Sequence, residues 1–268
     1  MTTAPRTGTY LNEILAHKAR EVSERLDGAD MAELEARARA VTGRLSLASA
    51  LKTGSLEIIA EIKRRSPSGE FRLDLDPVDV ANEYRRGGAA AVSVLTDERF
   101  FGGSLDDLQR VYASDARAEG LVVLRKEFII DERQIAESAA SGADAILLIV
   151  VALSAEQLGA LLRLTYDLGM EALVEVHDEA EVEIALDAGT RIIGINNRDL
   201  RRFRTDIAVS ERLLPSLPAN LVRVAESGIR SREDVQRVRE AGADAVLIGE
   251  TIMKSDDPAG RVKELRGC

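Results

Sequence analysis

One unit recurs along the chain, and its clearest copy is Gly142-Ala-Asp-Ala-Ile-Leu-Leu-Ile149. A glycine follows a segment of helical composition, a short turn comes next, and an apolar run closes the unit. Glycine suits the left-handed position that ends a helix, and an uninterrupted apolar run suits a strand that is covered on both faces. The pattern therefore predicts a helix, a turn and a buried parallel strand, in that order.

The same unit accounts for most of the chain. Further copies begin at Gly87, Gly189 and Gly242, and four more apolar runs precede or separate the copies. The eight runs end near Lys63, Leu95, Lys126, Val150, Val176, Asn196, Ser227 and Gly249. Successive ends are roughly 20 to 30 residues apart, which is the spacing of β-loop-α units. Eight such units predict an α/β fold, a (β/α)8 TIM barrel, with an open doubly wound sheet as the structural alternative.

The segment before the first strand is predicted to be helical. Apolar residues recur at helical spacing between Tyr10 and Leu26, and residues 31–41 are rich in Ala, Glu and Arg. About fifty residues of this composition would make a poor independent core. We therefore expect a single barrel domain over residues 1–268, in which residues 1–50 form an N-terminal helical extension that covers an end of the barrel.

Composition and charge narrow the classes of function. No apolar run approaches the roughly 20 residues of a membrane helix, and the first residues contain no signal-peptide stretch. The single cysteine, Cys268, excludes an internal disulfide framework and favours a cytoplasmic location. A net charge of −10 argues against nucleic acid or an anionic membrane as the main partner. Small anions remain open as ligands, because they respond to local charge.

Polar and ionisable residues collect at the ends of the predicted strands. In strand order these are Glu61 with Lys63, Lys126, Glu175, Asn196, Glu226 with Ser227, and Gly249 with Glu250. Each could by itself be a solvated side chain or a surface pair worth under about 1 kcal/mol. Barrel enzymes, however, place their chemistry at the carboxyl-terminal ends of the strands. Their collection at one rim therefore predicts an active site.

The last two strands also indicate a phosphorylated ligand. The motifs Ala225-Glu-Ser-Gly-Ile229 and Leu247-Ile-Gly-Glu-Thr251 bring glycines and backbone donors to strands seven and eight, where barrels often bind phosphate. Tight turns without a ligand are the alternative explanation.

Several other chemistries are disfavoured. The chain has only two histidines, and we expect His177 to be a rim residue and no metal to be bound. A nucleophile elbow and a dinucleotide-binding fingerprint are both missing from the sequence. What remains is cofactor-free acid–base catalysis by lysines and glutamates on a phosphorylated small molecule.

Five motifs together carry a resemblance to a known family. They are Glu61-Ile-Lys-Arg-Arg-Ser-Pro-Ser68, Ser93-Val-Leu-Thr-Asp-Glu-Arg-Phe-Phe-Gly-Gly-Ser104, Leu124-Arg-Lys-Glu-Phe-Ile-Ile-Asp131, Gly194-Ile-Asn-Asn-Arg-Asp-Leu200 and Val224-Ala-Glu-Ser-Gly-Ile229. In this order they resemble indole-3-glycerol phosphate synthase of tryptophan biosynthesis, a carboxy-lyase. The likeness runs from the N-terminal helix to strand eight, and the first, third and fifth motifs are the most specific.

The resemblance implies a reaction and roles for the charged residues. 1-(2-Carboxyphenylamino)-1-deoxyribulose 5-phosphate would close to indole-3-glycerol phosphate with loss of CO2 and water. Lys126 would be the general acid for condensation and Glu175 the general base. Lys63 would hold the anthranilate carboxylate, and Glu61 would orient Lys63.

The resemblance also implies a set of binding residues. These are Asn196 and Glu226 for the ribulose hydroxyls, Phe101 and Phe128 for the aromatic ring, Arg198 for the strand-six loop, and Ser66, Ser227, Gly228, Gly249 and Glu250 for the phosphate. Because the substrate is anionic and the chain is acidic, local cations must overcome the overall field. We expect that the crowding of two ammonium groups lowers lysine pKa values and strengthens the general acid.

The chain departs from the family pattern at two places. Glu127 stands where the family more often has Asp, and residues 69–72 replace a loop that in many members contains Lys-Gly.

Phosphoribosylanthranilate isomerase is disfavoured, because it needs a Cys/Asp pair at the barrel mouth. A non-catalytic phosphate-binding barrel should lack one of the four charged residues assigned to catalysis, yet all four are present. We expect a monomer, and association with other tryptophan-pathway enzymes is left open.

Overall fold

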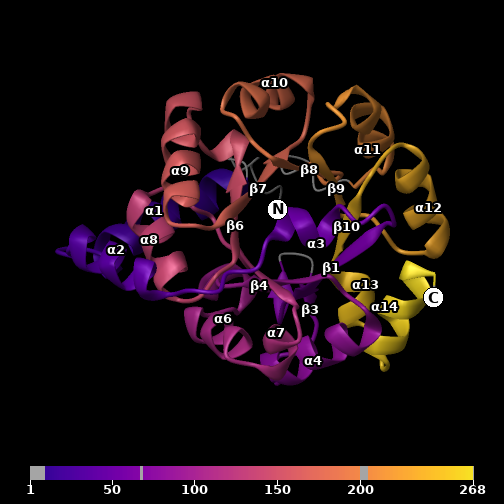
Figure 1. Ribbon diagram of the computed structural model, residues 1–268, viewed down its shortest axis with the longest axis horizontal. Helices are drawn as coiled ribbons and strands as arrows, with labels where there is room; N and C mark the ends of the chain where they lie inside the picture. The colour runs from indigo at the N-terminus through magenta and orange to yellow at the C-terminus, as the bar shows by residue number, and fades with distance from the viewer. Residues whose placement is uncertain (1–9, 67–68, 200–204, 268) are drawn as a thin grey trace, which may run out of the picture.

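The computed structural model describes residues 10–66, 69–199 and 205–267, so that Pro67, Ser68 and Cys268 lie outside the described residues. Eight parallel strands close into a barrel in the order β1-β10-β9-β8-β7-β6-β5-β4 (Figure 1). They are β1 (Glu57–Ile62), β4 (Ala91–Leu95), β5 (Val122–Lys126), β6 (Ala145–Ile149), β7 (Glu171–Val176), β8 (Ile192–Asn196), β9 (Val222–Glu226) and β10 (Ala245–Ile248). Each predicted strand end lies within one residue of the observed end. The TIM barrel is confirmed, and the open sheet is excluded.

Helices alternate with the strands and surround the barrel (Figure 1). The main ones are α4 (Pro77–Gly87), α6 (Leu105–Tyr112), α8 (Glu132–Ala140), α9 (Ala155–Asp167), α10 (Glu179–Asp187), α11 (Ala208–Leu213), α12 (Arg232–Glu240) and α14 (Pro258–Arg266). Shorter elements are α5 (Glu98–Phe101), α7 (Asp115–Ala118), α13 (Glu250–Met253), the 3-10 turns η1 (Val150–Ala152) and η2 (Leu214–Ser216), and a hairpin of β2 (Arg65–Ser66) with β3 (Gly69–Glu70). None of the described helices is long and apolar enough to cross a membrane.

The glycines of the repeated unit end helices as the sequence predicts. Gly142, Gly189 and Gly242 adopt positive φ angles of 91°, 84° and 107°. In the first copy the left-handed residue is Gly88 and not Gly87, which is the last residue of α4. Gly87 serves close packing instead, because a Cβ there would lie 2.7 Å from the backbone oxygen of Ala259.

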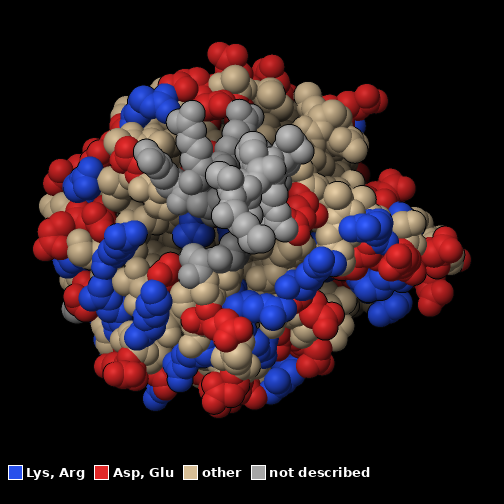
Figure 2. Space-filling model, turned by 180° about the vertical axis from the view of Figure 1, so that it is seen from behind, with Lys and Arg blue, Asp and Glu red and all other residues tan. Residues whose placement is uncertain are grey.

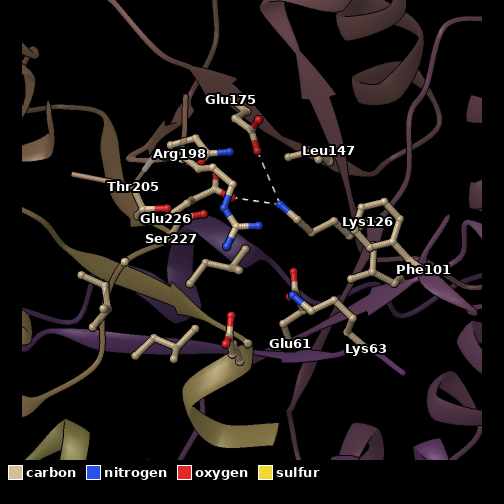
Figure 3. A pocket seen from close by; sticks show the side chains of 18 of the residues that line it. Glu61, Lys63, Phe101, Lys126, Leu147, Glu175, Arg198, Thr205, Glu226 and Ser227 are labelled. Carbon is tan, nitrogen blue, oxygen red and sulfur yellow. Dashed lines mark hydrogen bonds and ion pairs between the residues drawn. The ribbon is translucent and has the colours of Figure 1, made fainter. Parts of the chain in front are cut away.

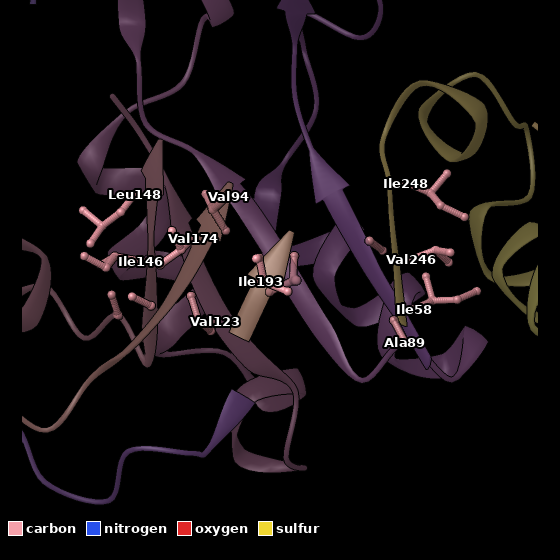
Figure 4. Packing of buried hydrophobic residues seen from close by; sticks show 14 of the residues in the cluster. Ile58, Ala89, Val94, Val123, Ile146, Leu148, Val174, Ile193, Val246 and Ile248 are labelled. Atoms are coloured by element: carbon pink, nitrogen blue, oxygen red, sulfur yellow. The ribbon is translucent and has the colours of Figure 1, made fainter. Parts of the chain in front are cut away.

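The strands are apolar on both faces because each face packs against a different layer. Inward side chains such as Ile59, Leu124 and Leu173 fill the barrel interior. Outward side chains such as Ile58 and Val123 pack against the surrounding helices (Figure 4). Consecutive residues of a strand point to opposite faces, so neighbours such as Ile58 and Ile59 belong to different layers.

The N-terminal segment forms α1 (Tyr10–Arg25), α2 (Met31–Ala40) and α3 (Leu47–Leu51). The last of these covers the amino-terminal end of the barrel, which faces the viewer in Figure 1. Leu47 and Leu51 pack into the barrel interior, and the Ala48 N–H donates a 2.8 Å hydrogen bond to Glu171 at the start of β7. Within the extension, α3 therefore covers this end of the barrel.

Helix α1 is fixed to the opposite, carboxyl-terminal side by a buried lysine. The Nζ atom of Lys18 lies 3.0 Å from Asp97, 3.0 Å from Glu127 and 2.8 Å from Glu21, and its side chain is only 1% exposed. Burial alone would lower the pKa of Lys18, but Glu127 and Asp97 outweigh burial and raise it. Glu127 also accepts a 2.8 Å hydrogen bond from Thr96. Lys18 thus joins the extension to the residue that follows Lys126.

Lys18→Met is expected to lower the free energy of unfolding by about 3–5 kcal/mol, because it leaves the buried carboxylates of Asp97 and Glu127 without their cation. Urea titration of both proteins measures this difference. Lys263→Met, at an exposed position of α14, is the matched control and should be nearly neutral. A loss below about 1 kcal/mol for Lys18→Met would show that the buried network does not depend on this lysine.

Candidate active site

A cavity of about 650 Å³ opens at the carboxyl-terminal ends of the strands. It is lined by the predicted site residues Glu61, Lys63, Phe101, Lys126, Phe128, Glu175, Asn196, Arg198, Glu226, Ser227, Gly228, Gly249 and Glu250. Ser66, on β2, is buried and is not among the described residues that line the cavity. The structure therefore brings together all but one of the residues that the sequence proposes.

Four charged side chains of this cavity come from alternate strands. Glu61 belongs to β1, Glu226 to β9, Glu175 to β7 and Lys126 to β5. In a TIM barrel, alternate strands contribute inward side chains to a shared layer. The Nζ atom of Lys126 lies 3.0 Å from Oε2 of Glu226 and 3.5 Å from Oε2 of Glu175 (Figure 3). Lys126 is thus the centre of the cluster.

The carboxylates set the protonation state of Lys126. Burial alone lowers the pKa of Lys126, but Glu226, Glu175 and Glu61 outweigh burial and raise the pKa above its usual value. The expectation that a neighbouring ammonium group lowers the pKa of this lysine is therefore wrong. Three carboxylates from distant parts of the chain surround it, and the resulting group is a firmly protonated ammonium.

The two glutamates next to Lys126 differ in charge. Burial opposes ionisation of Glu175, but Lys126 and His177 outweigh it and lower the pKa of Glu175. Burial raises the pKa of Glu226 to about 7, with Glu175 and Glu61 adding to the rise and Lys126 opposing it. Two neighbouring carboxylates whose pKa values move in opposite directions are typical of an acid–base site. Glu175 is the member that stays ionised and can act as a base at neutral pH.

A second lysine faces the same space. Lys63 Nζ donates a hydrogen bond to Glu61 Oε1, and it lies 5.4 Å from the ring centroid of Phe71. Burial opposes ionisation of Glu61, but Lys63 and Lys126 together lower its pKa. Figure 3 shows both side chains at the cavity, Lys126 from the end of β5 and Lys63 from the residue after β1. Two cations therefore border the space in which a dianionic ligand would lie.

Two glycines make room for the buried carboxylates. A Cβ at Gly194 would lie 2.1 Å from Oε1 of Glu226, and a Cβ at Gly249 would lie 2.2 Å from Oε1 of Glu61. Such distances are far inside van der Waals contact, so any side chain would displace the carboxylate. Gly249, expected from the sequence to contact phosphate, thus also positions Glu61.

Gly194→Ala is expected to lower kcat/KM at least tenfold, because a methyl group would move the Glu226 carboxylate away from Lys126 by about an ångström or more. Steady-state kinetics measures the effect. Gly159→Ala is the matched control, since its Cβ would meet only the end of the Arg163 side chain, at 3.3 Å. Equal kinetics for both variants would contradict the packing role of Gly194.

The turn after β9 has an unusual, left-handed backbone. Ser227 has φ 63° and is the one non-glycine residue with positive φ in the described part of the chain, and Gly228 follows with φ 81°. Such left-handed conformations are costly for a residue with a Cβ and often mark functional turns. The Asn197 Nδ2 group donates a 3.0 Å hydrogen bond to the Ser227 carbonyl and supports the turn.

Aromatic and loop residues form the rest of the wall. The rings of Phe101 and Phe128 are 6.0 Å apart between centroids and form an apolar side of the cavity. The backbone N–H of Arg198 donates a 3.0 Å hydrogen bond to Oδ1 of Asn196.

Five polar residues of the lining were not among the predicted site residues: Glu127, Thr205, Arg230, Thr251 and Lys254. Arg230 follows directly after a motif already singled out, and Lys254 lies four residues after Glu250, to which it donates a 2.6 Å hydrogen bond. Helical i, i+4 spacing could have found Lys254. Figure 2, which faces this end of the barrel, shows lysine and arginine side chains interspersed with aspartate and glutamate side chains. Among the described lining residues, five lysines or arginines stand against five glutamates, so the formal charges of the cavity balance although the whole chain carries −10.

The fold and the site define a barrel enzyme whose lysines and glutamates meet at the carboxyl-terminal mouth. The family profile described as indole-3-glycerol phosphate synthase matches residues 11–265. The chain therefore belongs to the indole-3-glycerol phosphate synthase family, and it is a carboxy-lyase of tryptophan biosynthesis.

Relatives and solved structures agree with this assignment. The indole-3-glycerol phosphate synthase of Dehalococcoides mccartyi strain CBDB1 is 51% identical over 222 residues, which cover 82% of this chain and 85% of that protein. The synthase of Roseiflexus sp. strain RS-1 is 47% identical over 265 residues, covering 97% and 98%. The structure of 3-hexulose-6-phosphate synthase from Salmonella typhimurium matches with a TM-score of 0.63 at 16% identity, covering 79% of this chain and 97% of that one, and shows the fold alone.

Proposed function

We propose that this enzyme closes 1-(2-carboxyphenylamino)-1-deoxyribulose 5-phosphate to indole-3-glycerol phosphate, with release of CO2 and water. One observation carries the proposal: the protonated Lys126 lies between Glu175 and Glu226, in the cavity that also holds the Lys63–Glu61 pair. Ring closure onto a carbonyl needs a proton donor for the carbonyl oxygen, and the later loss of water needs a base.

Lys126 is the proposed donor for condensation. As the ring carbon that bears the carboxylate attacks the carbonyl carbon, the oxygen takes a proton from the ammonium group. The new C–C bond then allows the bond to CO2 to break, and its electrons restore the ring. Because the developing alkoxide is far more basic than an amine, the raised pKa of Lys126 does not prevent this transfer.

Glu175 is the proposed base for the second half of the reaction. Loss of the hydroxyl group as water leaves a proton to be removed before the indole ring is complete, and the lowered pKa of Glu175 keeps it ready to accept that proton. Lys63 would bind the anthranilate carboxylate and donate a proton in the dehydration, oriented by Glu61.

The remaining cavity residues would bind the substrate. Glu226 Oε1 is buried and has no hydrogen-bond partner among the described residues, so it is available to a ribulose hydroxyl, with Asn196 nearby in the lining. Phe101 and Phe128 would contact the aromatic ring, and Arg198 would steady its loop. The phosphate would lie on the backbone of Ser227, Gly228, Gly249 and Glu250, with Ser66 as a further contact.

The decisive experiment mixes the purified enzyme with this substrate in EDTA and follows indole absorbance and fluorescence. The chain contains no tryptophan, so product fluorescence rises against a low background. Turnover in the chelator supports both the reaction and a mechanism that depends on lysine and glutamate. Tight binding without product would favour a phosphate-ligand-binding barrel. The absence of both binding and product would contradict the proposal.

We further propose that the whole chain acts as one domain, as a monomer in the cytoplasm. The packing of α3 into the barrel interior and of α1 onto Asp97 and Glu127 supports the single domain. Sedimentation analysis of the full chain at micromolar concentration tests the monomer. A mass above that of one 29.1 kDa chain would contradict it.

A further inference from the structure

A partly buried histidine lies behind the proposed base and is not one of the described residues that line the cavity. His177 is the first residue after β7, two positions beyond Glu175, and its side chain is 15% exposed. The Nε2 atom of His177 lies 3.5 Å from Oε1 of Glu175. Lys126 contacts the other carboxylate oxygen, Oε2. Glu175 is thus held between an ammonium group on one side and an imidazole on the other.

The other ring nitrogen of His177 is fixed by a second carboxylate. Nδ1 lies 3.0 Å from Oε2 of Glu181 on α10, and the backbone N–H of His177 donates a 2.9 Å hydrogen bond to the same oxygen. A carboxylate oxygen can only accept, so Nδ1 carries a proton. The structure therefore forms a row of carboxylate, imidazole and carboxylate from Glu181 through His177 to Glu175.

The protonation of Nε2 follows from its surroundings. This nitrogen is buried and forms no hydrogen bond within the described part of the chain. A lone pair at Nε2 would face the negative oxygen of Glu175, whereas an N–H would be attracted to it. Three carboxylates lie around the imidazole: Glu175 on β7, Glu181 on α10 and Glu226 on β9, with the Lys126 ammonium beyond Glu175. The turn η1, which contacts both β7 and α10, contains only Val and Ala and adds no charge. Burial opposes protonation, but these carboxylates outweigh it and raise the pKa of His177.

We propose that His177 is a positioning residue, which as an imidazolium anchored on Glu181 orients the Glu175 carboxylate and keeps it ionised for proton removal. The proposal rests on the role of Glu175 as the base. His177 acts through Glu175 and does not contact the substrate. Glu181 in turn acts through His177, since it fixes the tautomer and the ring plane.

The kinetic test is the pH profile of His177→Asn. Without the imidazolium, ionised Glu175 loses one of its two cationic neighbours, so its pKa rises. We expect the acidic limb of the kcat profile to move upward by about one pH unit. Because asparagine no longer orients the Glu175 carboxylate, we also expect kcat at pH 7 to fall about tenfold, with KM changed less than threefold. Glu181→Gln should move the limb in the same direction by a smaller amount. His17→Asn, at the only other histidine, should leave the profile unchanged.

A second measurement separates this proposal from the proposed reaction. The imidazole signals of a chain with two histidines can be followed by NMR as a function of pH, without substrate. Because the coupling is mutual, Glu175→Gln should lower the titration midpoint of His177 by about one unit and leave the His17 signals in place. That result supports the coupling even if the enzyme does not turn over the proposed substrate. An unmoved His177 midpoint, or a His177→Asn variant that loses stability but keeps its acidic limb, would overturn the proposal.

Discussion

Lys126→Ala is expected to lower turnover by about 10²–10⁴-fold, the range that general acid–base catalysis contributes. The substitution removes the proposed proton donor for the carbonyl oxygen. It also removes the cation that separates Glu175 from Glu226, so that two buried carboxylates face each other. Ionising both would then be costly, and Glu175 would become a poorer base. Donor and base are thus impaired by one change.

A conservative variant distinguishes these two effects. Lys126→Arg restores a positive charge beside Glu175 and Glu226, but a guanidinium does not give up its proton in proteins. We expect this variant to recover thermal stability and to remain at least 10²-fold slower than the wild type. Lys263→Ala is the matched control for loss of a lysine from an exposed helix. Turnover of Lys126→Ala within threefold of wild type would remove this residue from the acid role.

Glu175→Gln is expected to lower kcat by about 10²–10⁴-fold, with a much smaller change in KM. Glutamine has the same size and can still accept a hydrogen bond, so substrate binding should survive. It cannot take up the proton that must be removed after water has left. Its neutral amide also leaves Lys126 and His177 without a shared anion.

Comparison of two glutamates tests that the loss is specific. Glu179→Gln, on the exposed side of α10, changes the same residue type two positions from Glu181 and should leave kcat unchanged. Steady-state kinetics of both variants, with circular dichroism to check folding, measures the effect. A rise in KM with an unchanged kcat for Glu175→Gln would assign this residue to substrate binding and not to proton transfer.

The sequence predicted the barrel, and all but one of the site residues that it proposed line the cavity, because both depend on local patterns. An apolar run that ends in a charged residue marks a strand end, and parallel strands bring their carboxyl ends to the same side. For the same reason Lys126, Glu175 and Glu226 were predicted to share a site. Their positions in three strands of the sequence were sufficient for that inference.

The electrostatics of the site could not be predicted in the same way. The wrong direction for the pKa of Lys126 arose because the sequence shows which charges share a rim but not which atoms touch. Lys18 lies on a helix with many charged residues and is typical of a solvated face, yet it is fully buried. The partners of His177 and the contact of Gly194 with Glu226 likewise depend on side-chain directions that only the structure shows.

The pairing of β1 with β10, which closes the barrel, has a consequence for folding during synthesis. Glu57 of β1 pairs with Ala245 of β10, so β1 can form this pairing only after β10 has been synthesised. While the ribosome elongates the chain, β1 has β4 as a neighbour on one side and an open edge on the other. Open strand edges can pair with other chains. Nascent molecules are therefore exposed to aggregation until synthesis is nearly finished, and chaperones that cover such edges should matter most at this final stage.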